Sequence, residues 1–244
     1  FGRKAVSQTT SILSSKLASL MSMPLLKASD ATIPYPLVRG GRSVSEDNGN
    51  NILVRIGISH KDAGVGIREK LAVGEKNVNE LSSQITRTQD SRFRISEAMV
   101  LSTCNRFEIF IATSNPGLAV SHVYDVLAKR TEKNKNPVTV DTLSSKMKVI
   151  TGKRRVSEHL FRVTSGLDSI VLGEPQVLGQ VKTAWEIAKN KAMNGKAGHI
   201  LTSLFTNTLK TTGRIRSETA LSRGSMSVSS TAVGFSSGRI LNDL

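Results

Sequence analysis

The chain has 244 residues, and 38% of them are hydrophobic, which is enough to build a sizeable core. No apolar run approaches the roughly 18 residues of a membrane span, so we expect no transmembrane segment. The single cysteine excludes an internal disulfide, and the fold therefore does not depend on an oxidising compartment. A net charge of +15 favours a polyanionic partner such as nucleic acid.

The amino-terminal segment is basic and rich in serine and threonine. Residues 1–45 hold six basic residues against one acidic residue, Asp30. With the loosely amphipathic stretch SILSSKLASLMSMPLL, this composition predicts an organelle transit peptide, and a disordered basic tail is the alternative. The polar stretch at 43–51 predicts a linker, so residues 1–51 form the transit peptide and linker. Because the chain begins with Phe1, we expect a fragment at its amino end.

Residues 52–150 are predicted to alternate between strands and helices. Alternating, β-branched residues predict strands at 52–59, 95–102, 107–113 and 147–151. Apolar spacings of three and four predict helices at 65–72, 76–88 and 118–130. A polar loop is predicted at 131–146. The order strand, helix, strand, strand, helix, strand predicts a ferredoxin-like, split βαβ domain of the α+β class.

The remaining sequence predicts helices. Residues 151–220 contain three apolar stripes at helical spacing, and Pro175 suits the first turn of the second predicted helix. A last stripe at 221–244 predicts the truncated start of a long connecting helix. We therefore expect a helical part of the same domain after the ferredoxin-like part.

Cys104 is the residue with the clearest chemical potential. It lies in LSTCNRFEIF, in the tight connection between two predicted central strands. A lone cysteine is most often a small buried hydrophobe. A turn between strands exposes its side chains, however, and Arg106 two residues on can stabilise a thiolate or bind a carboxylate. A thiol is nucleophilic enough to attack an activated ester, so both roles stay open.

Other polar residues have ordinary structural explanations beside functional ones. His159 suits a structural position on its helix, Glu174 suits a helix start, and Ser169 suits a turn or cap. The four histidines lack metal-ligand spacing, so we expect no metal site. The sequence contains no G-x-G-x-x-G and no Walker loop, so we expect no cofactor-binding residues in this chain.

Four stretches together resemble glutamyl-tRNA reductase of the plant, chloroplast type, in its amino-terminal catalytic portion. They are GISHKDAGVGIREKLA, VLSTCNRFEIF, HLFRVTSGLDSIVLGEPQVLGQVK and GRIRSETALSRGSMSVSSTAV, which follow the family's order over about residues 52–233. The resemblance implies that the thiolate of Cys104 attacks the ester joining glutamate to tRNA(Glu). NADPH then reduces the thioester to glutamate-1-semialdehyde for tetrapyrrole synthesis, which supplies chlorophyll and haem. One departure is DAG at 62–64, where the family has Thr-Ala-Pro.

The resemblance also implies the site residues. His159 joins Cys104 in catalysis and would orient or protonate near the reacting carbonyl. Arg106 would bind the substrate side-chain carboxylate, and Glu174 its amino group. The substrate-binding set implied in this way is Thr103, Arg106, Ser169, Glu174 and Gln180.

The resemblance has consequences for the whole protein as well. The family continues into an NADPH-binding and a dimerisation domain, which these residues lack. We therefore expect thioester formation and hydrolysis to glutamate without semialdehyde. A homodimer and an aminotransferase partner are family features rather than expectations for this fragment, and the expected location is the chloroplast stroma.

Two other readings compete with the enzyme. The first is a noncatalytic basic RNA-binding module, which the positive charge and the cations Lys210, Arg214 and Arg216 favour. The second is a redox sensor built on the one cysteine.

Overall fold

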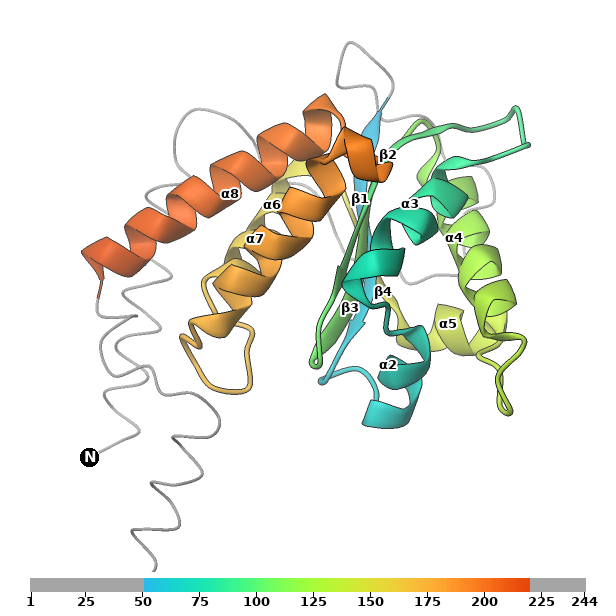
Figure 1. Ribbon diagram of the computed structural model, residues 1–244, viewed down its shortest axis with the longest axis horizontal. Coiled ribbons are helices and arrows are strands. Elements are labelled where there is room, and N and C mark those ends of the chain that lie inside the picture. The colour runs from blue at the N-terminus through green and yellow to red at the C-terminus, as the bar shows by residue number, and fades with distance from the viewer. Residues whose placement is uncertain (1–50, 220–244) are drawn as a thin grey trace, which may run out of the picture. The chain divides into compact units, whose positions relative to one another are not determined.

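The structure is a computed structural model that describes residues 51–219 (Figure 1). The strands are β1 (Ile52–Ser59), β2 (Ile95–Ser102), β3 (Arg106–Thr113) and β4 (Lys148–Thr151). The α-helices are α2 (Val65–Leu71), α3 (Val78–Thr86), α4 (Pro116–Thr131), α5 (Val140–Lys146), α6 (Lys153–Thr164), α7 (Gln176–Lys189) and α8 (His199–Glu218). Two short 3₁₀ helices are η1 (Glu75–Asn77) and η2 (Lys191–Met193).

The four strands form one antiparallel sheet in the order β2-β3-β1-β4. β1 and β3 lie in the middle, and β2 is an edge strand. With the element order of residues 52–151, this is the split βαβ arrangement. The predicted ferredoxin-like α+β class is therefore confirmed.

Helices cover both faces of the sheet, and each face has its own core (Figure 1). Because side chains alternate along a strand, Val54, Ile56 and Ile58 of β1 face α2, α3, α4 and α5. Leu53 and, on β3, Phe110 face α6, α7 and α8, where Trp185 stacks on Phe205 with ring centroids 5.6 Å apart. Polar strand residues of this second face are therefore buried rather than solvated.

The polar loop predicted at 131–146 was wrong in its second half. Residues Val140–Lys146 form α5, whose first backbone N–H groups are capped when Thr139 Oγ1 accepts from the Thr142 N–H at 3.2 Å. A seven-residue helix rich in serine and threonine has weak intrinsic propensity, and burial of Leu143 against the first core stabilises it. Pro175 lies one residue before α7 rather than in its first turn.

Some expectations fall outside the described residues. The transit peptide and linker lie there apart from Asn51, and so does the start of the connecting helix at 221–244. Between residues 51 and 219, no helix combines the length and apolar character that crossing a membrane requires.

Candidate active site

Cys104 lies at the exposed tip of the β2–β3 hairpin. The Thr103 N–H donates to the Arg106 carbonyl at 2.8 Å and closes the turn. The Thr103 hydroxyl accepts from the N–H groups of Asn105 and Arg106, both at 3.2 Å. The thiol is therefore carried by a turn whose backbone is fixed, and the alternative of a buried packing cysteine does not fit its exposure.

Two neighbouring segments hold the turn from outside. The His60 N–H, just past the end of β1, donates to the Asn105 carbonyl at 2.9 Å. The Arg68 guanidinium of α2 donates to the Cys104 carbonyl. A short Asp62 cap, in which Oδ2 accepts from the Ser59 N–H at 2.9 Å, fixes the segment that follows β1. The DAG stretch at 62–64, which departs from the Thr-Ala-Pro named above, thus begins in an ordered turn next to the hairpin.

The carboxylate of Glu108 is the centre of a buried network on β3. It is 0% exposed, and its Oε1 accepts from Arg55 Nη2 at 2.5 Å and from Arg106 Nη1 at 2.9 Å. His159 Nε2 of α6 lies 3.0 Å from both carboxylate oxygens. Arg55 Nη1 donates to the backbone carbonyls of Gly57 and Lys148. The network thus couples β1, β3, β4 and α6.

The ionisation of Glu108 decides the state of its neighbours. Burial by itself raises the pKa of this carboxyl, but the charge of Arg55 and the hydrogen bond and charge of His159, with Arg106, outweigh burial and hold the pKa well below its usual value. An ionised carboxylate only accepts hydrogen bonds. His159 Nε2 must therefore carry a proton, and its Nδ1 takes no part in the contact with Glu108.

Arg106 also reaches the loop that follows α6. It is 2% exposed, and its Nη2 donates to the Asp168 carbonyl at 3.0 Å and lies 3.5 Å from Asp168 Oδ2. The ammonium of Lys61 donates to the other oxygen of Asp168. Burial alone raises the pKa of Asp168, but the hydrogen bond from Lys61 and the charge of Arg106 hold it below the ordinary value. Asp168 therefore stands ionised beside Arg106.

The loop at 165–175 closes on itself. Gly166 has φ +76° and ends α6 with a Schellman motif, in which the Leu167 N–H donates to the Arg162 carbonyl at 2.9 Å. The Gly173 N–H then donates back to the Gly166 carbonyl at 3.0 Å. Both glycines are needed, because a Cβ on Gly166 would lie 2.9 Å from the Glu174 nitrogen and Gly173 also has positive φ. The loop thus carries Asp168, Ser169 and Glu174 as one unit.

The remaining predicted residues border this region. Ser169 Oγ is buried and has no hydrogen-bond partner within residues 51–219. Glu174 is 6% exposed. Gln180 of α7 lines a cleft of about 470 Å³ together with Gln176 and with Ser102, the residue before the hairpin turn. Arg106 thus contacts the 165–175 loop directly, Thr103 is bonded to Arg106, and His159 is linked to Arg106 through Glu108. The cleft brings Gln180 to the hairpin end of β2.

Positive charge surrounds His60. Burial, followed by the charges of Lys61, Arg106 and Arg68, lowers its pKa, against a smaller opposite effect of Asp168. His60 is therefore neutral at pH 7. Its Nδ1 is buried without a hydrogen-bond partner in the described part of the chain.

The sequence predictions missed Arg55, Glu108, Lys61 and Asp168 as members of the site. Charged residues inside the apolar strands ILVRIGIS and FEIFIAT are the signal that was available for the first two. Such residues are normally solvated on the open face of an antiparallel sheet. Here that face is covered by helices, so the charges meet each other instead.

Comparisons with known proteins agree with one another. A family profile described as Glutamyl-tRNAGlu reductase, N-terminal domain, matches residues 56–219. Glutamyl-tRNA reductases of Synechococcus sp. strain CC9605 and Pseudomonas aeruginosa strain PAO1 are 39% and 37% identical to the chain over 178 and 191 residues. These matches cover 73% and 78% of this chain, but only 38% and 42% of the relatives.

A solved structure gives the same result. Glutamyl-tRNA reductase from Methanopyrus kandleri is similar with a TM-score of 0.53 and 28% sequence identity. The similarity covers 75% of this chain and 39% of that one, so the chain spans less than half the length of the proteins it matches. Because the profile match extends over more than half of the chain, the chain belongs to the glutamyl-tRNA reductase family, and residues 56–219 correspond to its N-terminal domain.

Proposed function

We propose that this chain carries the acyl-transfer step of glutamyl-tRNA reduction. Sulfur of Cys104 bonds to the ester carbon, the bond from that carbon to the ribose oxygen breaks, and the oxygen takes up the proton that the thiol has lost. The products are a glutamyl thioester and uncharged tRNA(Glu). The observation that carries the proposal is an exposed thiol on a hydrogen-bonded turn that is followed at once by Arg106, whose guanidinium and His159 both contact Glu108.

The network gives each neighbouring residue a task in this step. His159, with Nε2 held by Glu108, would exchange a proton through Nδ1 near the reacting carbonyl. Arg106 would bind the substrate side-chain carboxylate. In this structure Asp168 contacts the same guanidinium. A substrate carboxylate would replace the 3.5 Å contact of Arg106 Nη2 with the Asp168 carboxylate, while Lys61 retains that carboxylate and the 3.0 Å bond of Arg106 to the Asp168 carbonyl stays.

The 165–175 loop and α7 would complete the glutamyl site. The buried hydroxyl of Ser169 has no partner within the described residues, so a substrate group would satisfy it. Glu174 would accept from the amino group, while Thr103 fixes the turn and Gln180 borders the cleft. On this proposal the glutamyl group lies between the ferredoxin-like part (52–150) and the helical part (151–220).

The later reduction belongs to the whole protein. There NADPH would supply the hydride that converts the thioester to glutamate-1-semialdehyde for tetrapyrrole synthesis. The residues of this chain do not fit that cofactor, because the sequence has no G-x-G-x-x-G and the described sheet is antiparallel. We therefore assign none of them to NADPH.

Location and assembly are further parts of the proposal. The basic, serine-rich segment before residue 46 supports import into a plastid, and relatives in cyanobacteria fit a plastid stroma location. A homodimer and an aminotransferase partner are proposed for the whole protein only.

The test uses the 244-residue chain with glutamyl-tRNA. Intact-protein mass spectrometry should detect a glutamyl adduct on the wild type and none on Cys104→Ser, with deacylation of tRNA falling at least about 10³-fold. Adduct formation on Cys104→Ser would point to another nucleophile. RNA binding without any adduct would favour the noncatalytic module, and peroxide-selective oxidation without an adduct would favour the redox sensor. With NADPH added, production of semialdehyde by the 244-residue chain would contradict the proposal that it performs acyl transfer without the reduction.

A further inference from the structure

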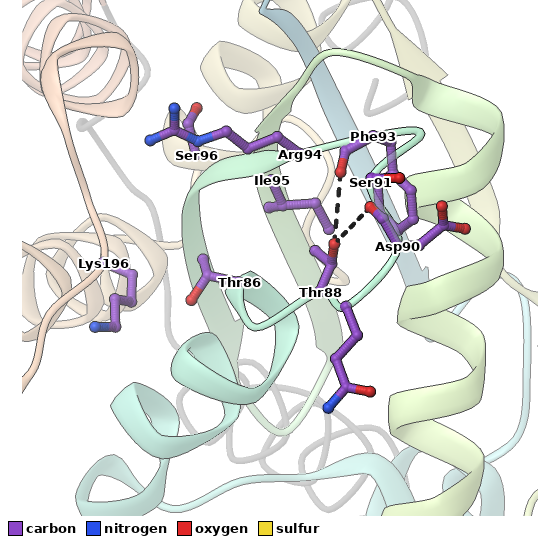
Figure 2. A pocket seen from close by; sticks show the side chains of 10 residues that line it. Thr86, Thr88, Asp90, Ser91, Phe93, Arg94, Ile95, Ser96 and Lys196 are labelled. Carbon is purple, nitrogen blue, oxygen red and sulfur yellow. Dashed lines mark hydrogen bonds between the residues drawn. The ribbon is translucent and has the colours of Figure 1, made fainter.

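A second pocket lies at the end of β2 that is remote from the hairpin. Its volume is about 470 Å³, and polar side chains of residues 86–96 and Lys196 line most of it (Figure 2). It contains none of the residues assigned to acyl transfer. The hairpin with Cys104 follows the last residue of β2, whereas this pocket surrounds the first two residues, Ile95 and Ser96.

The backbone around the pocket is well fixed. The register of β2 against β3 shifts at Ser96, which is a β-bulge of the kind that redirects side chains. Thr88 Oγ1 donates within the loop to the carbonyls of Asp90 and Phe93, as Figure 2 shows. Arg94 is held through its backbone by Ser114, with N–H to Oγ at 2.9 Å.

Lys196 comes to the pocket from a distant part of the chain. Its carbonyl accepts from the Ala98 N–H at 3.1 Å, so the segment before α8 adds to the edge of β2. Nearby, the buried carboxylate of Glu97 accepts from the N–H groups of Ile200 and Leu201 at the start of α8, at 3.0 and 2.8 Å. Two cations from separate segments are thus brought to one pocket by ordered backbone.

The charge in this pocket is uncompensated. Neither Arg94 nor Lys196 forms an ion pair with any residue between 51 and 219. The one lining acid, Asp90, is bound by Arg92, whose hydrogen bonds lower its pKa to about 2. In Figure 2 the Asp90 carboxylate points away from Arg94 and Lys196. The two cations and the hydroxyl of Ser91 suit a phosphate. The hydroxyls of Thr86 and Ser96 already donate to backbone carbonyls and only border the pocket.

We propose that this pocket binds a backbone phosphate of the RNA substrate, well away from the glutamyl end. The inference rests on the proposed function. The pocket and the hairpin lie at opposite ends of one eight-residue strand, about 25 Å apart at the usual rise per residue. The cleft with Ser102 and Gln180 borders the thiol end of the same edge strand. With the glutamyl end placed beside Cys104, the long, anionic RNA is the part of the substrate that extends far enough to meet the cations of this pocket.

A phosphate contact contributes affinity and position rather than sequence recognition. The double variant Arg94→Ala/Lys196→Ala should therefore raise KM for glutamyl-tRNA about tenfold and leave kcat unchanged. The dependence of log KM on log salt should become shallower by about one to two. Acyl transfer from a glutamyl ester of a small alcohol should stay at the wild-type rate.

The matched control removes two other exposed cations, as Lys133→Ala/Lys135→Ala, from the loop after α4. This variant removes the same number of positive charges as the pocket variant, and its KM for glutamyl-tRNA should stay near the wild-type value. An equal KM increase in both double variants would show only a loss of overall charge and overturn the proposal. An equal loss of rate on RNA and on the small ester would show a structural defect, with the same consequence.

Binding of uncharged tRNA, followed by fluorescence anisotropy, tests the pocket without any chemistry. The pocket variant should bind more weakly than the control variant, even if no version of the chain transfers an acyl group. If the pocket variant binds tRNA more weakly and no version of the chain transfers an acyl group, the proposed function fails but the proposed RNA contact holds. If RNA binding is unchanged but binding of inorganic phosphate is lost, the pocket takes free anions and the proposal is overturned.

Discussion

The turn of the β2–β3 hairpin and the start of β3 that follows it are held in opposite ways. Cys104 is exposed at the tip, and backbone hydrogen bonds hold its turn in place. Glu108, four residues further on, is completely buried and held by charges. The difference teaches that the reacting atom contributes little to the fold, whereas the groups that support it are part of the core. Effects on activity and effects on stability should therefore separate between the turn and the strand that follows it.

The strongest way to break this contrast is Glu108→Gln. The neutral amide leaves the buried guanidiniums of Arg55 and Arg106 without their common anion, so the free energy of unfolding should fall by about 3–5 kcal/mol. Urea unfolding at pH 7 measures this loss. Cys104→Ser is the control, since the exposed side chain should change the unfolding free energy by less than about 0.5 kcal/mol. Equal stability of the two variants would contradict the contrast.

The same residue predicts a pH dependence. The pKa of Glu108 is lower in the folded state than in the unfolded state, so the unfolded state takes up a proton first on acidification. The stabilisation is present above the unfolded-state pKa of about 4.3, and it is lost as the pH falls through the folded-state pKa. The acid limb of unfolding should be shallower for Glu108→Gln than for the wild type.

A smaller effect is expected at Gly57, which lies opposite Glu108 on β1. A Cβ there would lie 2.7 Å from the Phe107 carbonyl oxygen and 2.9 Å from the Glu108 Cα. Because these are backbone atoms, Gly57→Ala should cost about 1–3 kcal/mol of stability. The matched control is Gly213→Ala in the exposed part of α8, where nothing lies within 4 Å and alanine should stabilise by up to about 1 kcal/mol. Thermal denaturation of both variants gives the comparison, and a neutral Gly57→Ala would contradict the close packing of β1 against the start of β3.

The smallest expected effect concerns His60 beside the tip. Its pKa is lower in the folded state than the unfolded value of about 6.5, so the unfolded state binds more protons. Stability should therefore fall as the pH drops below about 6.5, and this part of the fall should vanish in His60→Gln. Urea unfolding between pH 7.5 and 5.5 measures the two slopes. Identical slopes would show that burial and the neighbouring positive charges do not lower the pKa of His60.

The sequence predicted the sheet because its strands are β-branched and its helices have regular apolar spacing. The place of Cys104 followed from the two strand patterns on either side of it. The Glu108 network did not follow, because alternation alone cannot tell whether the second face of a strand meets water or another layer of helices. Asp168 lies 62 residues from Arg106 and 107 from Lys61, and no local pattern connects residues so far apart. Helix α5 is missed because tertiary burial, rather than propensity, stabilises it.

The exposed position of Cys104 sets a time limit on the proposed chemistry. Once the thiol is acylated, the thioester sulfur lies on an exposed turn, so water can reach the bond that joins it to the glutamyl group. The acyl-enzyme is then a short-lived carrier whose yield depends on a race between hydrolysis and delivery. The lifetime of the adduct in water would set the rate that the following reduction must exceed.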